Sequence, residues 1–576
     1  MRIGTAAAAA AILAAATTLW SSGRAADARD QAPAAPAEHA MPMPAGPPAT
    51  LEGWTRGARL FEGLGDFHRK ATTANAEAQA YFDQGMRLTW AFNHDEATRS
   101  FAKAAALDPD CAACFWGVAL TLGPNYNLAT FADPRARVGW EALQKAKAAL
   151  PHASPVERAL IEAVAARYAG PQGQNESAVT SIAPAYAAAM AKVAAQFPDD
   201  LDVQTLYAEA LMDKNPWKLW DADGATAADT PLILDRLKFV LARDPRHLGA
   251  NHYYVHAVEA SKHPEDALVS AERLRTLAPA AGHIDHMPAH IFQRVGRYED
   301  SVIANQQGAK ADLAYYALSP PPDYYPMYTG HNYQFLAFSA AMEGNRAETI
   351  EALRRTRQTL PDDMLMGMPG IDWQVGFLYQ AMVRFGLWDE ILAEPEANPK
   401  LIGLRASYLE ARASALAAKG RIAEARSTSD ELAALLDATP ADSLQQTNTA
   451  RDLFAIALLK ARARIALAEH KPQAAVALLE QAVAAEDKLA YDEPADCFYP
   501  TRHLLGAALL AAGEPAKAEA VYRRDLALNP ANGWSLKGLE LSLRAQGRAA
   551  DADAAAHDLA KAWTHADGPV LASAAI

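Results

Sequence analysis

The sequence of 576 residues has little of three things that would narrow its class: positive charge, cysteine and long hydrophobic runs. It carries 68 acidic against 54 basic residues and lacks the basic stripe that nucleic-acid binding needs. Beyond the N-terminus, no stretch is apolar and long enough to predict a membrane span. Period-two alternation, the mark of half-buried strands, is also scarce. We therefore expect an all-α protein that binds no nucleic acid and does not span a membrane.

Cysteine is nearly absent, with three residues in the whole chain. Cys111 and Cys114 form a C-x-x-C pair, and Cys497 stands alone. No second C-x-x-C completes a zinc site, and no histidine follows Cys114 as covalent haem attachment requires. In an oxidising compartment the pair favours a structural disulfide, while free thiols and redox chemistry stay open.

Familiar catalytic motifs are missing too. The sequence has no P-loop, no G-x-G-x-x-G after a strand, no readable nucleophile–base–acid triad and no H-E-x-x-H helix of the zinc proteases. The sequence indicates no reaction, and whether the protein is an enzyme stays open.

What is present begins with an export signal. Met1 and Arg2 give a short positive start, residues 5–19 are rich in Ala, and residues 26–28 (ADA) offer a cleavage site. We predict a signal peptide over residues 1–28 and an Ala/Pro-rich disordered linker over residues 29–50. The mature protein is expected to be periplasmic or secreted.

A repeat of 34 residues organises the rest of the chain. Residues 78–111 carry small residues, an aromatic and a proline at the places that tetratricopeptide hairpins use: Gly85, Ala97, Phe101, Ala104 and Pro109. Residues 499–532 repeat the pattern with Gly506, Gly513, Ala518, Tyr522 and Pro530. The sequence predicts an all-α, tetratricopeptide-type α-solenoid, a right-handed superhelix of about ten helical hairpins.

This register divides the chain into three regions. They are an N-terminal helical region over residues 51–247, histidine-rich central repeats over residues 248–363, and C-terminal repeats over residues 364–565. The central repeats contain a tyrosine-rich insertion, residues 316–329, which we expect to form a surface loop at the binding face. Aromatic residues in and around these loops are candidates for ligand binding: Trp217, Trp220, Tyr253, Tyr324, Tyr325 and Tyr328.

Two histidine pairs repeat with the same period. His252 and His256 lie four residues apart, and 34 residues later His286 and His290 do the same. The likeness to tetratricopeptide repeats implies that positions 2, 5, 9 and 12 of the first helix line the concave groove. Those positions add three further candidate ligands: His283, His331 and Glu259.

Six imidazoles and one carboxylate suit a transition metal such as copper, zinc or iron, and not calcium or magnesium. They are enough for one ion or for two sets around a dinuclear centre. Side chains four apart on a helix lie about 5–6 Å from each other, so both pairs can reach a shared ion. A metal carrier and a metalloenzyme remain open, as does a non-catalytic scaffold that binds a peptide, a protein partner or a small molecule in the same groove.

The chain also resembles a group of exported bacterial tetratricopeptide proteins of poorly defined function. The residues that carry the resemblance are 91–97 (AFNHDEA), 108–117, 123–127 (GPNYN), 216–220 (PWKLW), 251–261, 282–290, 331–332, 491–494 and 499–500. The match covers roughly residues 80–545. It implies the fold and export, and it brings no reaction.

Overall fold

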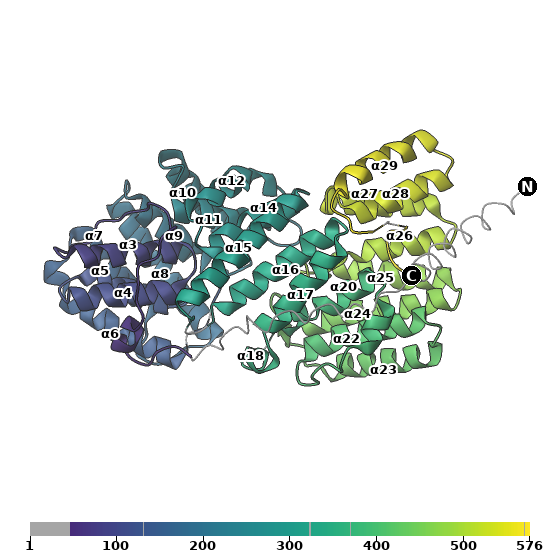
Figure 1. Ribbon diagram of the computed structural model, residues 1–576. Helices are drawn as coiled ribbons and strands as arrows, with labels where there is room; N and C mark the ends of the chain where they lie inside the picture. The colour runs from purple at the N-terminus through teal and green to yellow at the C-terminus, as the bar shows by residue number, and fades with distance from the viewer. Residues whose placement is uncertain (1–45, 129, 131, 322–323, 369, 569–570) are drawn as a thin grey trace, which may run out of the picture. The chain divides into compact units, whose positions relative to one another are not determined.

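A computed structural model describes residues 46–128, 130, 132–321, 324–368, 370–568 and 571–576 (Figure 1). The signal peptide and most of the linker lie outside the described residues, so both stay predictions. The backbone contacts divide the chain into two compact units. Among the described residues, the N-terminal unit takes those of 46–292 and 303–332, and the C-terminal unit takes those of 293–302 and 333–576.

The elements that begin before residue 330 are α2 (Leu51–Thr55), α3 (Ala76–Trp90), α4 (His94–Leu107), α5 (Ala112–Leu122), α6 (Asp133–Ala148), η1 (Leu150–His152), α7 (Pro155–Val164), η2 (Ala165–Arg167), α8 (Glu176–Gln196), α9 (Leu201–Met212), α10 (Thr230–Arg243), α11 (Leu248–Val258), η3 (Pro264–Ala267), α12 (Leu268–Leu277), α13 (Gly282–His286), α14 (Pro288–Arg294), α15 (Tyr298–Leu318) and α16 (Pro326–Met342). Helices α14, α15 and α16 contribute residues to both units.

The C-terminal unit continues with α17 (Arg346–Thr359), α18 (Asp362–Met366), α19 (Asp372–Val375), α20 (Phe377–Arg384), α21 (Trp388–Ala393), α22 (Ile402–Ala418), α23 (Ile422–Ala438), β1 (Leu444–Gln445), β2 (Asn448–Thr449), α24 (Ala450–Ala468), α25 (Pro472–Glu486), α26 (Thr501–Ala511), α27 (Pro515–Leu528), α28 (Gly533–Ala545) and α29 (Ala549–Ala562). Strands β1 and β2 form one short antiparallel pair.

The all-α prediction is confirmed, because consecutive helices pack as hairpins and each hairpin packs on the next. In the N-terminal unit α3 packs on α4 and α4 on α5, and in the C-terminal unit the helices from α22 to α29 do the same. The handedness of the superhelix and the count of about ten hairpins stay predictions.

The same packing contact, an aromatic ring between two glycines of neighbouring helices, holds the hairpins together in both units. Phe101 of α4 fits between Gly85 and Gly117, where an added Cβ would lie within 2.5 Å of the ring. Tyr522 of α27 fits between Gly506 and Gly538, where a Cβ would lie 2.2 Å from the ring. The predicted small residue of each repeat is therefore the surface on which the next helix packs.

The prediction that the tyrosine-rich insertion forms a surface loop is wrong. Residues 316–318 continue α15, and α16 already begins at Pro326, so the connection between them is short. The tyrosines on both sides are buried. Helix α15 extends past the expected boundary because no proline or glycine interrupts residues 309–318.

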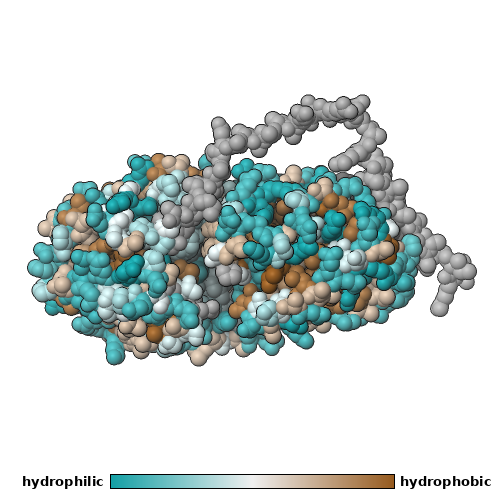
Figure 2. Space-filling model, turned by 90° about the horizontal axis from the view of Figure 1, so that it is seen from below, coloured by the Kyte–Doolittle hydropathy of each residue, from teal (hydrophilic) through white to brown (hydrophobic). Residues whose placement is uncertain are grey.

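One helix departs from the expectation of no membrane span. Among the described residues, Ser177–Gln196 of α8 is long and apolar enough to cross a membrane by length and composition alone. Helix α8 packs on α7 and α9, as a core helix of a repeat protein does. One face of the molecule is largely hydrophilic with smaller apolar areas (Figure 2).

Candidate metal centre

The first histidine pair lies on α11. His252 and His256 are one turn apart, so their rings leave the helix on the same face. Gly249 lets α11 approach the end of α3, since a Cβ there would meet the Trp90 ring at 2.5 Å. The Nδ1 of His252 lies 2.6 Å from the carbonyl oxygen of Trp90. A carbonyl only accepts, so Nδ1 donates and the Nε2 of His252 carries the lone pair.

The second pair straddles a break between α13 and α14. Pro288 has no backbone N–H and interrupts the helix between His286 and His290. The Nδ1 of His286 donates to Oδ1 of Asn305 on α15, at 2.6 Å. The Nε2 atoms of His286 and His290 then face each other across 2.6 Å.

Glu259 connects the two pairs. Its Oε1 lies 3.0 Å from Nδ1 of His256, and its Oε2 lies 2.7 Å from Nδ1 of His290. A carboxylate accepts from both rings and leaves each Nε2 with a lone pair. An oxygen acceptor behind the ring is the usual partner of a metal-bound imidazole. Glu259, expected from the sequence as a ligand, thus contacts the rings from behind.

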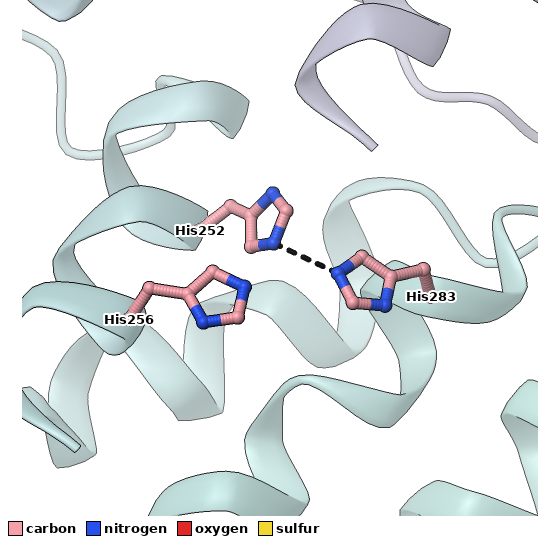
Figure 3. Close-up of side chains that lie close together, drawn as sticks. All are labelled: His252, His256 and His283. Atoms are coloured by element: carbon pink, nitrogen blue, oxygen red, sulfur yellow. Dashed lines mark hydrogen bonds between the residues drawn. The ribbon is translucent and has the colours of Figure 1, made fainter. Parts of the chain in front are cut away.

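His283 and His331 come from the helices that follow each pair. The Nε2 of His283, on α13, lies 3.1 Å from Nε2 of His252, and the rings of His252, His256 and His283 point toward one another (Figure 3). His331, on α16, has its ring centroid 5.0 Å from that of His286. All six predicted histidines are therefore neighbours within the N-terminal unit.

Three groups of these residues can each offer three ligand atoms within 4.8 Å of one another. They are His252 with His256 and His283, His286 with His290 and His331, and His256 with Glu259 and His290. Nitrogens that share an ion at about 2.0–2.1 Å lie no more than about 4.2 Å apart, so shifts of a few tenths of an ångström complete each group.

Burial keeps five of these imidazoles neutral. Five of the six histidines and Glu259 have exposed fractions of 2% or less, and His331 is half-buried. Burial is the main cause that lowers the pKa of His252, His256, His283, His286 and His331 well below the usual range. The neutral ring is the form that binds a metal, so protons compete weakly at this cluster.

The prediction that these histidines line an open groove is wrong. Side chains of other elements in the N-terminal unit pack over the rings and bury them. Phe92 is the central one: its ring centroid lies 4.5–5.6 Å from those of His252, His256 and His283. These contacts join residues 160 to 191 positions apart in the sequence, which a 34-residue register does not reveal.

Phe92 occupies a strained position. It lies in the turn between α3 and α4 with φ of 53°. At the corresponding turn of six later hairpins the residue with positive φ is a glycine (Gly296, Gly344, Gly386, Gly420, Gly513 and Gly547), and at the turn between α24 and α25 it is His470. A phenylalanine there is disfavoured by roughly 1–3 kcal/mol, and the fold retains it with its ring on the histidines.

The predicted aromatic ligands divide into two groups. Trp217 and Tyr328 touch the cluster, with ring centroids 5.7 Å from His256 and 4.7 Å from His283. Tyr126, which sequence reasoning missed, stacks on Trp217 and lies 5.6 Å from His256. Trp217 also has a positive φ, of 61°.

The remaining aromatic candidates are held in other contacts. Trp220 donates from Nε1 to the carbonyl of Ala257 at 2.8 Å. Tyr325 donates to Asp312 at 2.9 Å, and Tyr324 lies 3.4 Å from Nδ1 of His94. Tyr253 is buried against Trp90 and Phe92 and, unlike the other three, also touches the cluster, with its ring centroid 5.4 Å from that of His252. Each of these contacts gives the residue a packing role.

Like Tyr126, Asn305 and Phe92 are contributors that the sequence did not single out as site residues. Asn305 carries no spacing signal, because its link to His286 depends on how α13 meets α15. That approach is close at two glycines: a Cβ on Gly282 would lie 2.7 Å from the carbonyl of Gly308. The absence of glycine at residue 92 was a usable signal, since six later hairpin turns have a glycine at this position.

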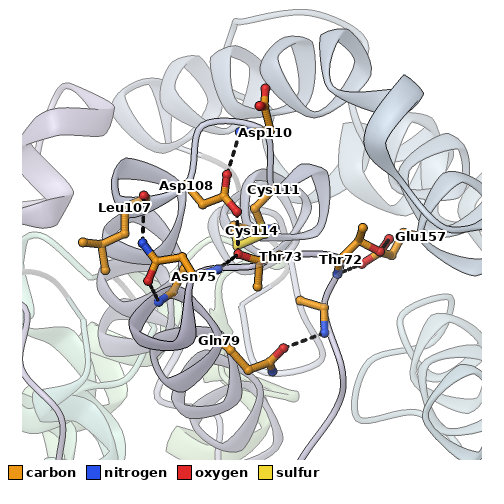
Figure 4. Close-up of a disulfide and its surroundings, with 12 residues drawn as sticks. Thr72, Thr73, Asn75, Gln79, Leu107, Asp108, Asp110, Cys111, Cys114 and Glu157 are labelled. Atoms are coloured by element: carbon orange, nitrogen blue, oxygen red, sulfur yellow. Dashed lines mark hydrogen bonds between the residues drawn. A yellow bond between two sulfur atoms is a disulfide. The ribbon is translucent and has the colours of Figure 1, made fainter.

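The cysteine pair lies outside all three groups. Cys111 and Cys114 are joined by a disulfide at the start of α5, with their Cα atoms 5.3 Å apart (Figure 4). Cys111 also caps α5, because its Sγ accepts from the backbone N–H of Cys114 at 3.2 Å. Nearby, Asn75 caps α3 and donates to the carbonyl of Leu107 at 3.1 Å. Cys497 is buried and free.

The fold and the site define an all-α helical-repeat protein with a buried cluster of six histidines around one glutamate. No family model and no curated protein matches the chain. Solved structures with some likeness are a chain of the APC/C hetero-tetramer Cut9–Hcn1 (14% identity, TM-score 0.33, 89% of this chain and 77% of that chain) and an IFIT1 monomeric mutant with m7Gppp-AAAA (13%, 0.33, 78% and 90%). A third is the TPR domain of P58(IPK) (13%, 0.21, 82% and 99%). Likenesses this distant say nothing of function.

Proposed function

We propose that this protein binds a transition metal through the histidine cluster of its N-terminal unit. The observation that carries the proposal is the pair of Nε2 atoms of His286 and His290. The Nδ1 of each ring is directed at an oxygen acceptor, so two lone pairs meet across 2.6 Å. Two imidazole nitrogens directed at one point can bind one cation together.

A metal ion fits this place better than a proton. Burial opposes protonation of His286, and a buried imidazolium would need a nearby counter-charge. Neutral imidazoles backed by oxygen acceptors suit copper, zinc, iron or nickel.

The burial of the rings favours holding or delivering an ion over turning over a substrate. Catalytic zinc keeps a position open to solvent or substrate, and here Phe92, Trp217 and Tyr328 cover the cluster. The same burial weakens the rival function of a peptide-binding scaffold at this place, because a peptide would meet few exposed histidine atoms. Export to the periplasm or the medium is part of the proposal and is supported by residues 1–28 of the sequence.

The test is metal retention by the full chain purified without a histidine tag. Stripped protein is loaded with Zn²⁺ or Cu²⁺, desalted and measured by elemental analysis. We expect stoichiometric metal in the wild type and in His263→Ala, an exposed histidine of the same unit, and none in the double variant His256→Ala/His290→Ala. No retained metal in the wild type would overturn the proposal, as would full retention in the double variant.

A further inference from the structure

We infer that the cluster is two metal sites rather than one, produced by repeating a single three-histidine site along the helical register. This inference rests on the proposed function and adds the number of ions and the ligands of each. Site one is His252, His256 and His283, and site two is His286, His290 and His331.

The register itself generates the second site from the first. His252 to His286 and His256 to His290 are steps of 34 residues. His283 to His331 is a step of 48 residues, and removing the 14 residues of the insertion at 316–329 leaves 34 again. Each site therefore takes two histidines from the first helix of one repeat and one from the start of the first helix of the next.

The structure assembles these positions as the register requires. In site one, α11 supplies the pair and α13 the third ring, with centroids 4.9 Å from His252 to each partner. In site two, α13 and α14 supply the pair and α16 the third ring, with centroids 4.5 and 5.0 Å from His286 to its partners. Two equivalent helix contacts thus produce two similar triangles of imidazoles.

One buried nitrogen points independently to an occupant of site one. The Nε2 of His256 makes no hydrogen bond, although the side chain is at least 98% buried. A buried polar nitrogen without a partner is disfavoured by about 1–3 kcal/mol, and a metal–nitrogen bond removes that penalty.

A single shared ion does not account for six rings. Between the two sites, His283 and His286 have centroids 5.8 Å apart, and His256 and His290 have centroids 5.4 Å apart. One ion would take about four of the imidazoles, so the other two would not be ligands. Three protein ligands and one further position is a common complement for an ion of the zinc or copper class.

Glu259 acts as a positioning residue for both sites. One carboxylate oxygen binds Nδ1 of His256 in site one, and the other binds Nδ1 of His290 in site two. Filling either site strengthens the orientation of the shared carboxylate, so binding of the first ion is expected to favour the second.

The experiment counts ions in the full chain and in one variant for each site. Stripped protein is titrated with Zn²⁺ alone and with Cu²⁺ alone, desalted and measured by elemental analysis. We expect two ions per wild-type chain and one in each of His283→Ala and His331→Ala, with His263→Ala unchanged. The Cu²⁺ form provides a second readout, because two neighbouring copper ions couple and weaken the electron paramagnetic resonance signal, whereas each variant shows one isolated ion.

The outcomes separate this inference from the proposed function. One ion in the wild type, lost in both variants, overturns the two-site inference and leaves metal binding intact. Two ions in the wild type and two in either variant overturn the ligand sets. No ion in the wild type overturns both. Circular dichroism of the metal-free variants shows that they fold, and His331→Ala, at the half-buried edge, is the variant least prone to misfold.

Discussion

The two units share a packing device and differ in what they bury beside it. Both place an aromatic ring between glycines of neighbouring hairpins, Phe101 in one and Tyr522 in the other. The N-terminal unit then buries imidazoles that face one another, whereas the C-terminal unit buries carboxylates that face donors. Asp492 accepts from Thr447, Gln374 and the backbone of Glu493.

The contrast between the units helps to distinguish a buried polar cluster that binds a ligand from one that is satisfied by its own hydrogen bonds. Asp372 accepts from two backbone amides at the start of α22 and from Gln445. The carboxylates of Asp372 and Asp492 are thus matched by donors of the chain itself. Among the described residues, the groups with three ligand atoms within 4.8 Å all consist of cluster histidines and Glu259. Buried polarity alone does not indicate a metal site, and facing acceptors do.

Removing the aromatic ring that packs between two glycines should destabilise each unit more than any other change considered. Phe101→Ala and Tyr522→Ala each remove a buried aromatic ring, which destabilises by about 3–5 kcal/mol. We expect the loss to be confined to the unit that carries the change, as measured by hydrogen exchange resolved along the chain. Val269→Ala, an exposed position, serves as the control. Equal loss of protection in both units from either change would show that the units fold as one.

A smaller effect is a pH dependence of the C-terminal unit. Burial raises the pKa of Asp492 to about 7, and burial together with the charge of Asp492 raises that of Asp496 well above its usual range. The folded pKa lies above the unfolded value, so the stabilisation is complete below about pH 4 and is lost as pH rises through about 7.

Asp496→Asn removes one titrating group while keeping an oxygen to accept from Asn448. Between pH 5 and pH 7.5 we expect this variant to gain stability relative to the wild type, by on the order of 2 kcal/mol. Denaturant-dependent hydrogen exchange of α24 and α26 measures the difference. Asp558→Asn, on the exposed side of α29, controls for surface charge. A relative loss of stability with rising pH would contradict the sign.

The contrast between the units was only partly visible in the sequence. The 34-residue step placed all six histidines and Glu259 together, because helical register is a local property. Their burial was not predicted, since it depends on Phe92, Tyr126 and Trp217, which arrive from other hairpins. The prolines of the tyrosine-rich insertion indicated a loop over all of residues 316–329, although residues 316–318 form the end of helix α15.

Metal loading is expected to act on one unit only. At free metal one hundred times the dissociation constant, binding stabilises the folded state by about 2.7 kcal/mol per site. Protection of α11, α13 and α14 should therefore rise on loading, while that of α24 and α26 stays constant. The double variant His256→Ala/His290→Ala should show no change. A rise in both units would indicate binding to the C-terminal carboxylates and remove the distinction between the two kinds of buried cluster.

The smallest expected effect is that of Glu259→Gln, which tests whether Glu259 binds the metal itself or positions the histidines that bind it. Glutamine keeps the shape but has one acceptor oxygen, so either His256 or His290 must face an amide N–H instead. That ring loses its fixed tautomer, and such changes behind a ligand weaken metal binding by about 10–100-fold. Chelator competition with Glu259→Gln measures the affinity, and Glu265→Gln, an exposed neighbour, provides the control. If Glu259→Gln instead removed one whole ion, Glu259 would be a ligand, and the carboxylate would belong to the third group, with His256 and His290.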